Sequence, residues 1–243
     1  MPIAIVIVTL NVLGELRRTI ESLAGLQDPR VTVLVVDGAS RDGTPDYLKS
    51  LPPERVRWIS EPDRGIYDAM NKGWNLVPPD AWVLYLGAGD TVRSLPTADT
   101  LARCDAEGEH LVIGRCRMGQ GFHVSRWTPD IRYGNTVHHQ ALLLRRSVAG
   151  ESPFDDTLRV YGDWDFNLRL YCRSLRARFD DSFTSEAMPG GISATICLPE
   201  IWRVALRHGG LRGGAKAYLM NVDAKWRIVL RNRLRGLRGV YGR

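Results

Sequence analysis

Four short apolar runs, separated by segments of helical periodicity, occupy the first ninety residues of this chain. The runs span residues 3–8, 31–36, 56–59 and 81–86, and β-branched side chains dominate the first two. Continuous apolar runs of this length are typical of parallel strands that helices cover on both faces. The β-α-β-α-β-α-β order predicts an α/β fold with a doubly wound, mainly parallel sheet.

Helices are expected between these runs, and the pattern continues less regularly beyond residue 90. A turn that places Pro45 at the first helical position, for example, is a helix-start signal. The further expected elements are helices over residues 13–24, 44–50, 66–77 and 164–171 and strands over residues 110–118 and 139–144. With no internal repeat or long linker between them, residues 1–199 are expected to form a single domain.

Polar side chains follow the apolar runs. Thr9, Asp37 and Asp90 come after three of them, and residues 61–63 come after the fourth. Right-handed crossovers bring the carboxyl ends of parallel strands to one rim of the sheet, where α/β proteins bind ligands. Another acid, Asp163, opens an expected helix. Acids in such places favour an enzyme that holds a divalent cation and a phosphorylated ligand.

Two fingerprints of other nucleotide-binding folds are missing from the sequence. There is no G-x-x-x-x-G-K-[ST] phosphate loop, and no G-x-G-x-x-G joins the first run to the first helix. The phosphates of a nucleotide must therefore be held in another way, for which a metal ion and basic side chains are the expected means.

Basic charge is concentrated at the C-terminal end. Residues 201–243 contain eleven Lys and Arg and one acid, Asp223, whereas residues 1–200 contain 22 basic and 26 acidic residues. Trp, Leu and other apolar residues are interleaved with these arginines, which predicts a basic amphipathic helical tail over residues 200–243. Such a helix suits an anionic membrane surface. The alternatives are a helix that packs on its own domain, an oligomer contact or, on charge alone, a nucleic-acid contact.

Six motifs, in the same order, resemble those of the inverting family 2 glycosyltransferases of the GT-A fold, in particular the exopolysaccharide and glycolipid sugar transferases. They are IVIVTLN (residues 5–11), VVDGASRDGT (35–44), SEPDRGIYDAMNKG (60–73), HQA (139–141), GDWDF (162–166) and GGIS (190–193). Each motif alone is weak, but the ordered set is specific. The resemblance implies a GT-A, Rossmann-like sheet with a nucleotide-binding half over residues 1–90 and an acceptor and catalytic half over residues 91–199.

The resemblance also implies a catalytic base and a metal ligand. Asp163 aligns with the acid that deprotonates the acceptor hydroxyl, although an acid at a helix start is often only an N-cap. Asp165 is expected to be an acid of the helix start or to hold the residues of the site in place. The family's metal motif is commonly D-x-D, but here it is Gly87-Ala88-Gly89-Asp90, with one carboxylate. Asp90 is therefore the expected ligand of Mn²⁺ or Mg²⁺, which the donor's phosphates and water would complete.

The remaining implied residues bind the nucleotide-diphospho-sugar. Asp37 is expected to accept a hydrogen bond from the nucleobase, and Thr9 and Asn11 to line the base and ribose pocket. Asp63, Arg64 and Lys72 are expected to frame the ribose and diphosphate, with Arg64 equally compatible with a solvated surface charge. Gly89 belongs to the donor-binding segment. His139 could contact the metal, the diphosphate or the acceptor, or be structural. The paired glycines of the last motif predict a loop over the donor.

Together these features predict a metal-dependent, inverting glycosyltransferase that moves a sugar to a glycan or lipid-linked acceptor. A UDP-sugar is favoured over a GDP- or dTDP-sugar, and no nucleic-acid partner is expected. The N-terminus has no basic signal region and no apolar run approaches the ~18 residues of a membrane span. The expected place is therefore the cytoplasm, at the inner face of the cell membrane. The alternative is a degenerate, non-catalytic domain that serves as a membrane-associated assembly subunit.

Overall fold

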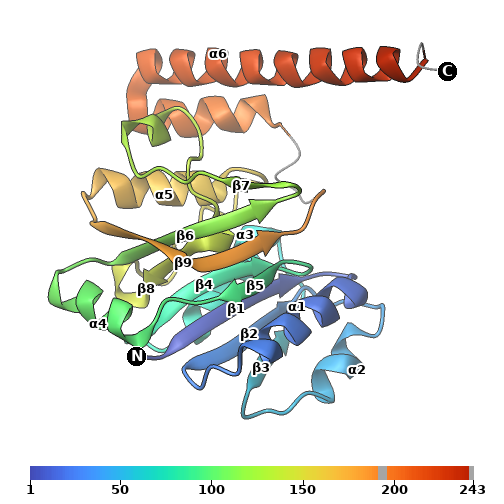
Figure 1. Ribbon diagram of the computed structural model, residues 1–243, viewed down its shortest axis with the longest axis vertical. Coiled ribbons are helices and arrows are strands. Elements are labelled where there is room, and N and C mark those ends of the chain that lie inside the picture. Colours follow the sequence, from blue (N-terminus) through green and yellow to red (C-terminus); the bar gives the residue numbers. More distant parts are fainter. Residues whose placement is uncertain (191–195, 241–243) are drawn as a thin grey trace.

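The computed structural model describes residues 1–190 and 196–240, and the side chains of residues up to 223. Within these ranges nine strands form one sheet in the order β3-β2-β1-β4-β8-β6-β9-β5, with β7 paired to β6 (Figure 1). The strands are β1 (Ile3–Thr9), β2 (Val31–Asp37), β3 (Val56–Ser60), β4 (Trp82–Gly87), β5 (Thr91–Ser94), β6 (Leu111–Met118), β7 (Gly121–His123), β8 (Leu142–Arg145) and β9 (Ala177–Ala187). The helices are α1 (Leu13–Leu26), α2 (Thr44–Lys49), α3 (Ile66–Leu76), α4 (Ala98–Ala106), α5 (Gly162–Cys172) and α6 (Leu198–Val240).

The four predicted strands of the first ninety residues form the parallel part of the sheet. In the register, Thr9 lies opposite Asp37 and Asp37 lies opposite Ser60. On the other side of β1, Val8 lies opposite Gly87 at the end of β4. The carboxyl ends of these strands therefore meet at one rim, as the sequence predicted.

The second part of the sheet mixes directions. Strands β8 and β4 are antiparallel, as are β6 and β8, whereas β6 and β9 are parallel. The predicted strand over residues 139–144 is wrong in its first half, because residues His139–Ala141 form a 3₁₀ turn and the strand begins at Leu142. There, the backbone N–H of Ala141 donates to the carbonyl of His138 at 3.0 Å. The sequence reasoning also missed β5, β7, β9 and α4.

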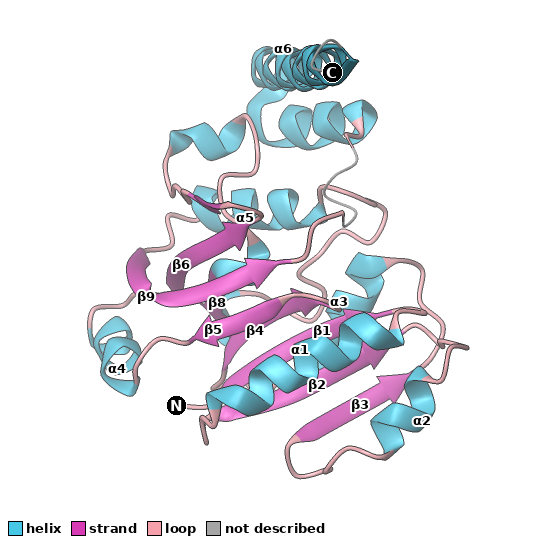
Figure 2. Ribbon diagram, turned by 45° about the vertical axis from the view of Figure 1, so that its right-hand side comes forward, coloured by secondary structure: helices cyan, strands magenta, loops and turns pink. Residues whose placement is uncertain are grey.

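Helices cover both faces of the sheet, and each face has its own apolar core. Helices α1, α2 and α4 bury Leu16, Leu48 and Leu101 on one face, and Figure 2 shows α1 lying across β1 and β2. On the other face, α3 and α5 bury Trp74 and Trp164. A large apolar side chain buried in this way contributes about 1.5–3 kcal/mol. Because helices cover both faces, the central strands β1 and β4 are apolar and buried almost throughout.

Gly73 allows α3 to lie directly on the sheet. A Cβ atom at this position would come within 2.3 Å of Val6 Cγ1 on β1. Because α3 carries the motif of residues 60–73, this close packing fixes the N-terminus of α3 at the rim.

Helix α6 consists of two helical parts joined at Gly210, whose φ of 62° and ψ of −169° are not helical. Its first part buries Ile201 and Val204 in the core. Beyond the kink the chain folds back, so that the rings of Trp202 and Tyr218 meet edge to face at 6.1 Å. The expected tail thus starts two residues inside a helix that packs on the domain. No helix among the described residues is long and apolar enough to cross a membrane.

Candidate active site

Backbone hydrogen bonds continue beyond the strand ends and hold the rim loops together. Gly38 N donates to Thr9 O at 3.0 Å and Glu61 N donates to Asp37 O at 3.0 Å. Next to them, Ala88 N donates to Val8 O at 3.2 Å. These bonds draw the loops after β1, β2, β3 and β4 together at one rim of the sheet, where several of the predicted site residues lie.

Asp37 is fully buried and anchors the loop after β2. Its carboxylate accepts hydrogen bonds from Ser60 Oγ at 2.6 Å, from Ser40 N at 3.1 Å and from Ser40 Oγ. Ser40 Oγ in turn accepts from Asn11 N at 2.7 Å. Asp37 thus couples the loops after β1 and β2, and its contact with a nucleobase stays a prediction.

Thr9 and Asn11 lie in the loop that follows β1. Thr9 is buried, and its Oγ1 has no hydrogen-bond partner in the part of the chain that the structure describes. Asn11 has a positive φ of 54° and accepts a hydrogen bond from Arg41 N at 2.8 Å. A buried hydroxyl without a partner is costly, so Thr9 offers a polar group at the place predicted for base and ribose.

The α3 end of the rim carries paired charges. Asp63 accepts from Gly65 N at 2.8 Å, and Arg64 lies 2.8 Å from Asp68. Lys72 Nζ donates to Pro62 O at 2.7 Å. Arg64 and Lys72 therefore already have partners, but the Arg64 side chain is 75% exposed and free to exchange them.

A cavity of about 670 Å³ adjoins this end of the rim. Its walls come from the start of α3 and from the loop before α5. The lining residues are Asp63, Arg64, Gly65, Asp156, Thr157 and Arg159. Its mixed charge suits a polar, hydroxylated ligand.

Asp90 is held in a tight turn after β4. It is 5% exposed, and its carboxylate accepts from Gly87 N and from Met188 N, each at 2.8 Å. Gly89 has a φ of 101°, and a Cβ atom there would come within 2.1 Å of Met188 Sδ, so this position requires glycine. The turn therefore fixes the direction of the carboxylate.

The donor set at Asp90 fits a weakly held cation. Each oxygen accepts one backbone bond and keeps a lone pair for a further ligand. No group of three His, Cys, Asp or Glu able to hold a metal occurs among the described residues. One carboxylate is what Mg²⁺ or Mn²⁺ takes from a protein when phosphates and water supply the rest. The residues present thus fit a cation shared with a diphosphate.

Asp163 is not the N-cap of α5, because the helix starts at Gly162 with Tyr161 as its N-cap. Its Oδ2 accepts from Asn135 Nδ2 at 2.8 Å and lies 3.5 Å from His139 Nδ1. Its Oδ1 lies 3.4 Å from the hydroxyl of Tyr67. The side chain remains 18% exposed. Asp163 is thus a fixed carboxylate that solvent and ligand can reach.

His139 pairs with Asp163 and also senses the charge of Asp90. Burial acts to lower the pKa of His139, but the hydrogen bond with Asp163 and the charges of Asp163 and Asp90 outweigh it and raise that pKa. Burial and the neighbouring His123 and His139 instead lower the pKa of His138 to about 4. Of the two adjacent histidines, His139 therefore binds a proton more readily, and its functional role stays a prediction.

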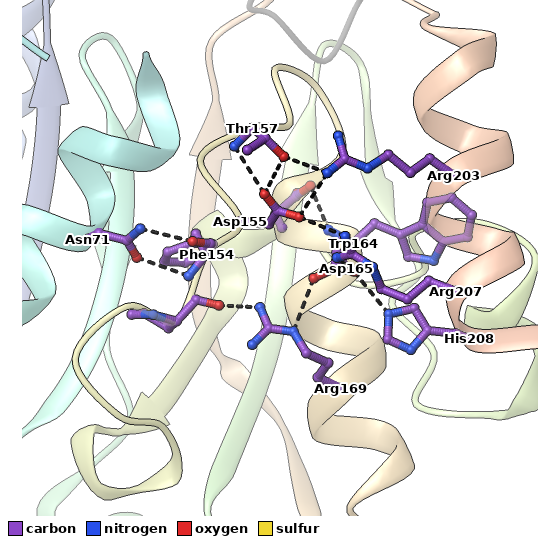
Figure 3. A network of polar contacts seen from close by, with 12 residues as sticks. Asn71, Phe154, Asp155, Thr157, Trp164, Asp165, Arg169, Arg203, Arg207 and His208 are labelled. Carbon is purple, nitrogen blue, oxygen red and sulfur yellow. Dashed lines mark hydrogen bonds and ion pairs between the residues drawn. The ribbon is translucent and has the colours of Figure 1, made fainter. Parts of the chain in front are cut away.

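Asp165 has a structural position. Its carboxylate is fully buried and lies 2.8 Å from Arg207, 3.0 Å from His208 and 3.0 Å from Arg169. Figure 3 shows these side chains of α5 and α6 directed at it. Asp163 therefore lies at the candidate site, whereas Asp165, two residues later, joins α5 to α6.

Sequence reasoning singled out His139 but missed the other two partners of Asp163, Asn135 and Tyr67. Asn135 lies in a loop without a motif, and Tyr67 lies inside the recognised segment of residues 60–73 but gave no separate signal. The loop predicted over residues 190–193 lies, from residue 191, outside the described residues, as do the tail side chains beyond residue 223.

Comparison of the chain with known proteins finds glycosyltransferases. Residues 4–161 match the family model described as Glycosyl transferase family 2. A "PGL/p-HBAD biosynthesis glycosyltransferase" of Mycobacterium tuberculosis (strain ATCC 25618 / H37Rv) is 37% identical over 184 residues, which cover 69% of each chain. The "Succinoglycan biosynthesis protein ExoO" of Rhizobium meliloti is 31% identical over 112 residues, covering 46% of this chain and 32% of that protein.

Solved structures share the fold at low identity. Residues 1–349 of S. aureus TarS in complex with UDP-GlcNAc give a TM-score of 0.64 at 16% identity, covering 84% of this chain and 64% of that one. In a longer TarS structure the match covers 39% of that chain. The mannosyltransferase PcManGT of Pyrobaculum calidifontis, in complex with GDP-Man and Mn²⁺, gives 0.53 at 16% identity, covering 85% and 61%.

Proposed function

Because the chain belongs to glycosyltransferase family 2, we propose that it transfers a sugar, with inversion, from a nucleotide-diphospho-sugar to a glycan or lipid-linked acceptor. The geometry of Asp163 is the observation that carries the proposal. Two neighbours, Asn135 and His139, hold one oxygen of its carboxylate, and the side chain still reaches solvent.

In the proposed reaction Asp163 takes the proton from the acceptor hydroxyl as that oxygen attacks the anomeric carbon. The bond from this carbon to the nucleoside diphosphate breaks on the opposite face, so the configuration inverts. His139, whose Nδ1 lies 3.5 Å from Asp163, would add positive charge near the leaving diphosphate when it is protonated. A divalent cation held by Asp90 would add charge stabilisation for the same group.

The donor is proposed to bind along the strand-end rim. Thr9, Asn11 and Asp37 would surround the nucleoside, and Asp63, Arg64 and Lys72 would face the ribose and diphosphate. A UDP-sugar is our first choice, and the printed ligands of the fold neighbours, UDP-GlcNAc for TarS and GDP-Man with Mn²⁺ for PcManGT, support a nucleotide-sugar in general.

The test begins with a thermal-shift screen of UDP-, GDP- and dTDP-sugars with and without Mn²⁺. A true donor raises Tm, and more so the more tightly it binds at a given concentration, and the increase should require the cation. The second step measures transfer of the sugar from that donor to glycan and glycolipid acceptors. A protein that no nucleotide-sugar stabilises and that transfers none would refute the proposal.

A second candidate is a non-catalytic domain of an assembly, which the single-carboxylate metal segment favours. It predicts no turnover of any donor. Slow hydrolysis of the donor by the purified protein, lost in Asp90→Ala, would exclude it.

For the basic tail we propose reversible attachment to an anionic membrane surface, at the cytoplasmic face, where lipid-linked acceptors would be found. The charge of residues 201–243 supports this, since each Lys or Arg near such a surface contributes about 1 kcal/mol. Because the first part of α6 packs on the domain, the informative truncation removes only the residues that follow Asp223.

Truncation after Asp223 should abolish sedimentation with vesicles of anionic lipid and leave Tm and transfer to a water-soluble acceptor nearly unchanged. Salt should weaken attachment of the full chain. Equal sedimentation of the full chain with neutral and anionic vesicles would contradict the membrane role.

A further inference from the structure

Glu200, near the start of α6, reaches the segment that precedes Asp163. One carboxylate oxygen accepts from Arg159 N at 2.7 Å, and the other accepts from Val160 N at 2.9 Å and Tyr161 N at 3.1 Å. Three consecutive backbone N–H groups therefore converge on one side chain from a distant part of the sequence. Hydrogen bonds to a charged acceptor are about twice as strong as neutral ones, so Glu200 should hold the backbone of residues 159–161 strongly.

The contact lies where α5 begins. Helix α5 starts at Gly162, and its N-cap, Tyr161, contributes no capping side-chain bond. The N-terminus of a helix has unpaired N–H groups and a partial positive charge, which an acid stabilises. Glu200 supplies this acid from another helix, and the three N–H groups that it binds belong to residues 159–161, two to four positions before Asp163, the proposed base.

The opposite side of the same turn is closed by Tyr67 of α3. Its hydroxyl donates to Val160 O at 2.7 Å, and a Cβ atom at Gly162 would come within 2.7 Å of its ring. The turn before Asp163 is thus held between Tyr67 on one side and Glu200 on the other. Removal of either contact would free the turn to move.

We propose that Glu200 is a positioning residue for sugar transfer: it fixes the turn of residues 159–161 and thereby the direction in which Asp163 presents its carboxylate. The proposal rests on the proposed role of Asp163 as the base. A base that moves by a fraction of an ångström loses rate, because proton transfer depends on alignment with the acceptor hydroxyl. None of the residues that we propose to bind the donor lies in this turn, and of the residues of the turn only Arg159 lines the cavity beside the rim.

The test compares Glu200→Ala and Glu200→Gln with Arg203→Gln. Arg203 lies one turn later on α6 and donates to Thr157 Oγ1 at 2.7 Å, so its variant removes a contact between α6 and the domain without touching residues 159–161. Glu200→Ala should lower kcat of transfer about tenfold to a hundredfold. Donor KM should stay within about twofold, since the lost interaction acts only on the transition state.

Glu200→Gln keeps one acceptor oxygen and should recover part of the rate, and Arg203→Gln should keep it. Rates are compared per folded molecule, with circular dichroism and Tm as the measure of folding. If Glu200→Ala does not fold, Glu200→Gln against Arg203→Gln decides the question.

Three results would overturn the proposal: a wild-type kcat in both Glu200 variants, equal losses in Glu200→Gln and Arg203→Gln, or a rise in donor KM at unchanged kcat. Asp163→Asn is measured in parallel. If it retains wild-type transfer, the base assignment fails, whatever Glu200 does. If it is inactive while both Glu200 variants keep full rate, only the positioning role fails.

Discussion

The two halves of the sheet hold their acids in different ways. Asp37, in the parallel half, has its partners Ser40 and Ser60 at 3 and 23 residues along the chain. Asp163, in the mixed half, is approached by Tyr67 from 96 residues away and by Asn135 from 28. Asp37 is thus held by partners from the first sixty residues, whereas Asp163 also depends on Tyr67, 96 residues away.

The sharpest test of this division is Asp163→Asn. Loss of the base should lower kcat of transfer by roughly 10²–10⁴, while donor affinity and Tm stay close to wild type. Transfer kinetics and calorimetric donor titration measure the two effects separately. A variant that loses donor binding together with rate would show that the mixed half also binds the donor.

Asp165→Asn, two residues further on, should affect stability instead. It removes the charge that Arg169, Arg207 and His208 surround, which should cost about 2–3 kcal/mol in free energy of unfolding. This is below the cost for a fully buried pair because both arginines are partly exposed. Denaturant unfolding measures it, and Asp46→Asn, at an exposed ion pair on α2, is the control with an expected loss under about 0.5 kcal/mol.

Asp90→Asn tests metal binding at the place where the parallel part of the sheet meets the mixed part, since Asp90 follows β4 and binds Met188 after β9. Its carboxylate should hold the cation that bridges the diphosphate, so the variant should bind the donor roughly tenfold or more weakly in Mn²⁺. EDTA should bring the wild type to the same weak affinity and leave the variant unchanged. Calorimetry with Asp80→Asn as control checks this, and equal donor affinity of the wild type with and without chelator would refute it.

The smallest effect is the pH dependence of His139. Because its pKa is raised in the folded protein, protonated His139 stabilises the fold fully below the unfolded pKa of about 6.5, and this contribution disappears as pH rises through the raised value. The Tm difference between wild type and His139→Gln should therefore be largest at mildly acidic pH. A difference independent of pH would show that the ion pair with Asp163 contributes nothing.

The same contrast explains what the sequence could and could not predict. Apolar runs and strand-end acids predicted the parallel half and its rim, because these signals are local. The strand predicted over residues 139–144 was extended too far towards the N-terminus, because only residues 142–144 are a run of leucines and His139–Ala141 form a 3₁₀ turn. Residues 177–187 escaped notice because Asp180 and Asp181 interrupt the alternation expected of a strand. Thr97, which caps α4 by accepting from Thr100 N, was a local signal that could have been used.

The role of Asp165 was predicted in outline and its partners were not. A helix-start acid is visible in sequence, whereas Arg207 and His208 lie on the expected tail, more than forty residues away. That tail was assigned to a membrane as a whole, and its first part proved to be a component of the domain core. Only contacts between residues far apart in the sequence show whether such a segment packs on its own domain or is left to bind a membrane.

The bond from Met188 N to Asp90 has a consequence for the order of folding, because it spans 98 residues. Contacts of such separation form late, since the loop entropy must be overcome first. A chain in which only the parallel half has formed would present Asp90 without its second anchor and would bind a cation poorly. During refolding, Trp fluorescence should therefore recover before Mn²⁺-dependent donor binding does. The nascent enzyme would thus remain unable to consume its donor until strand β9 is in place.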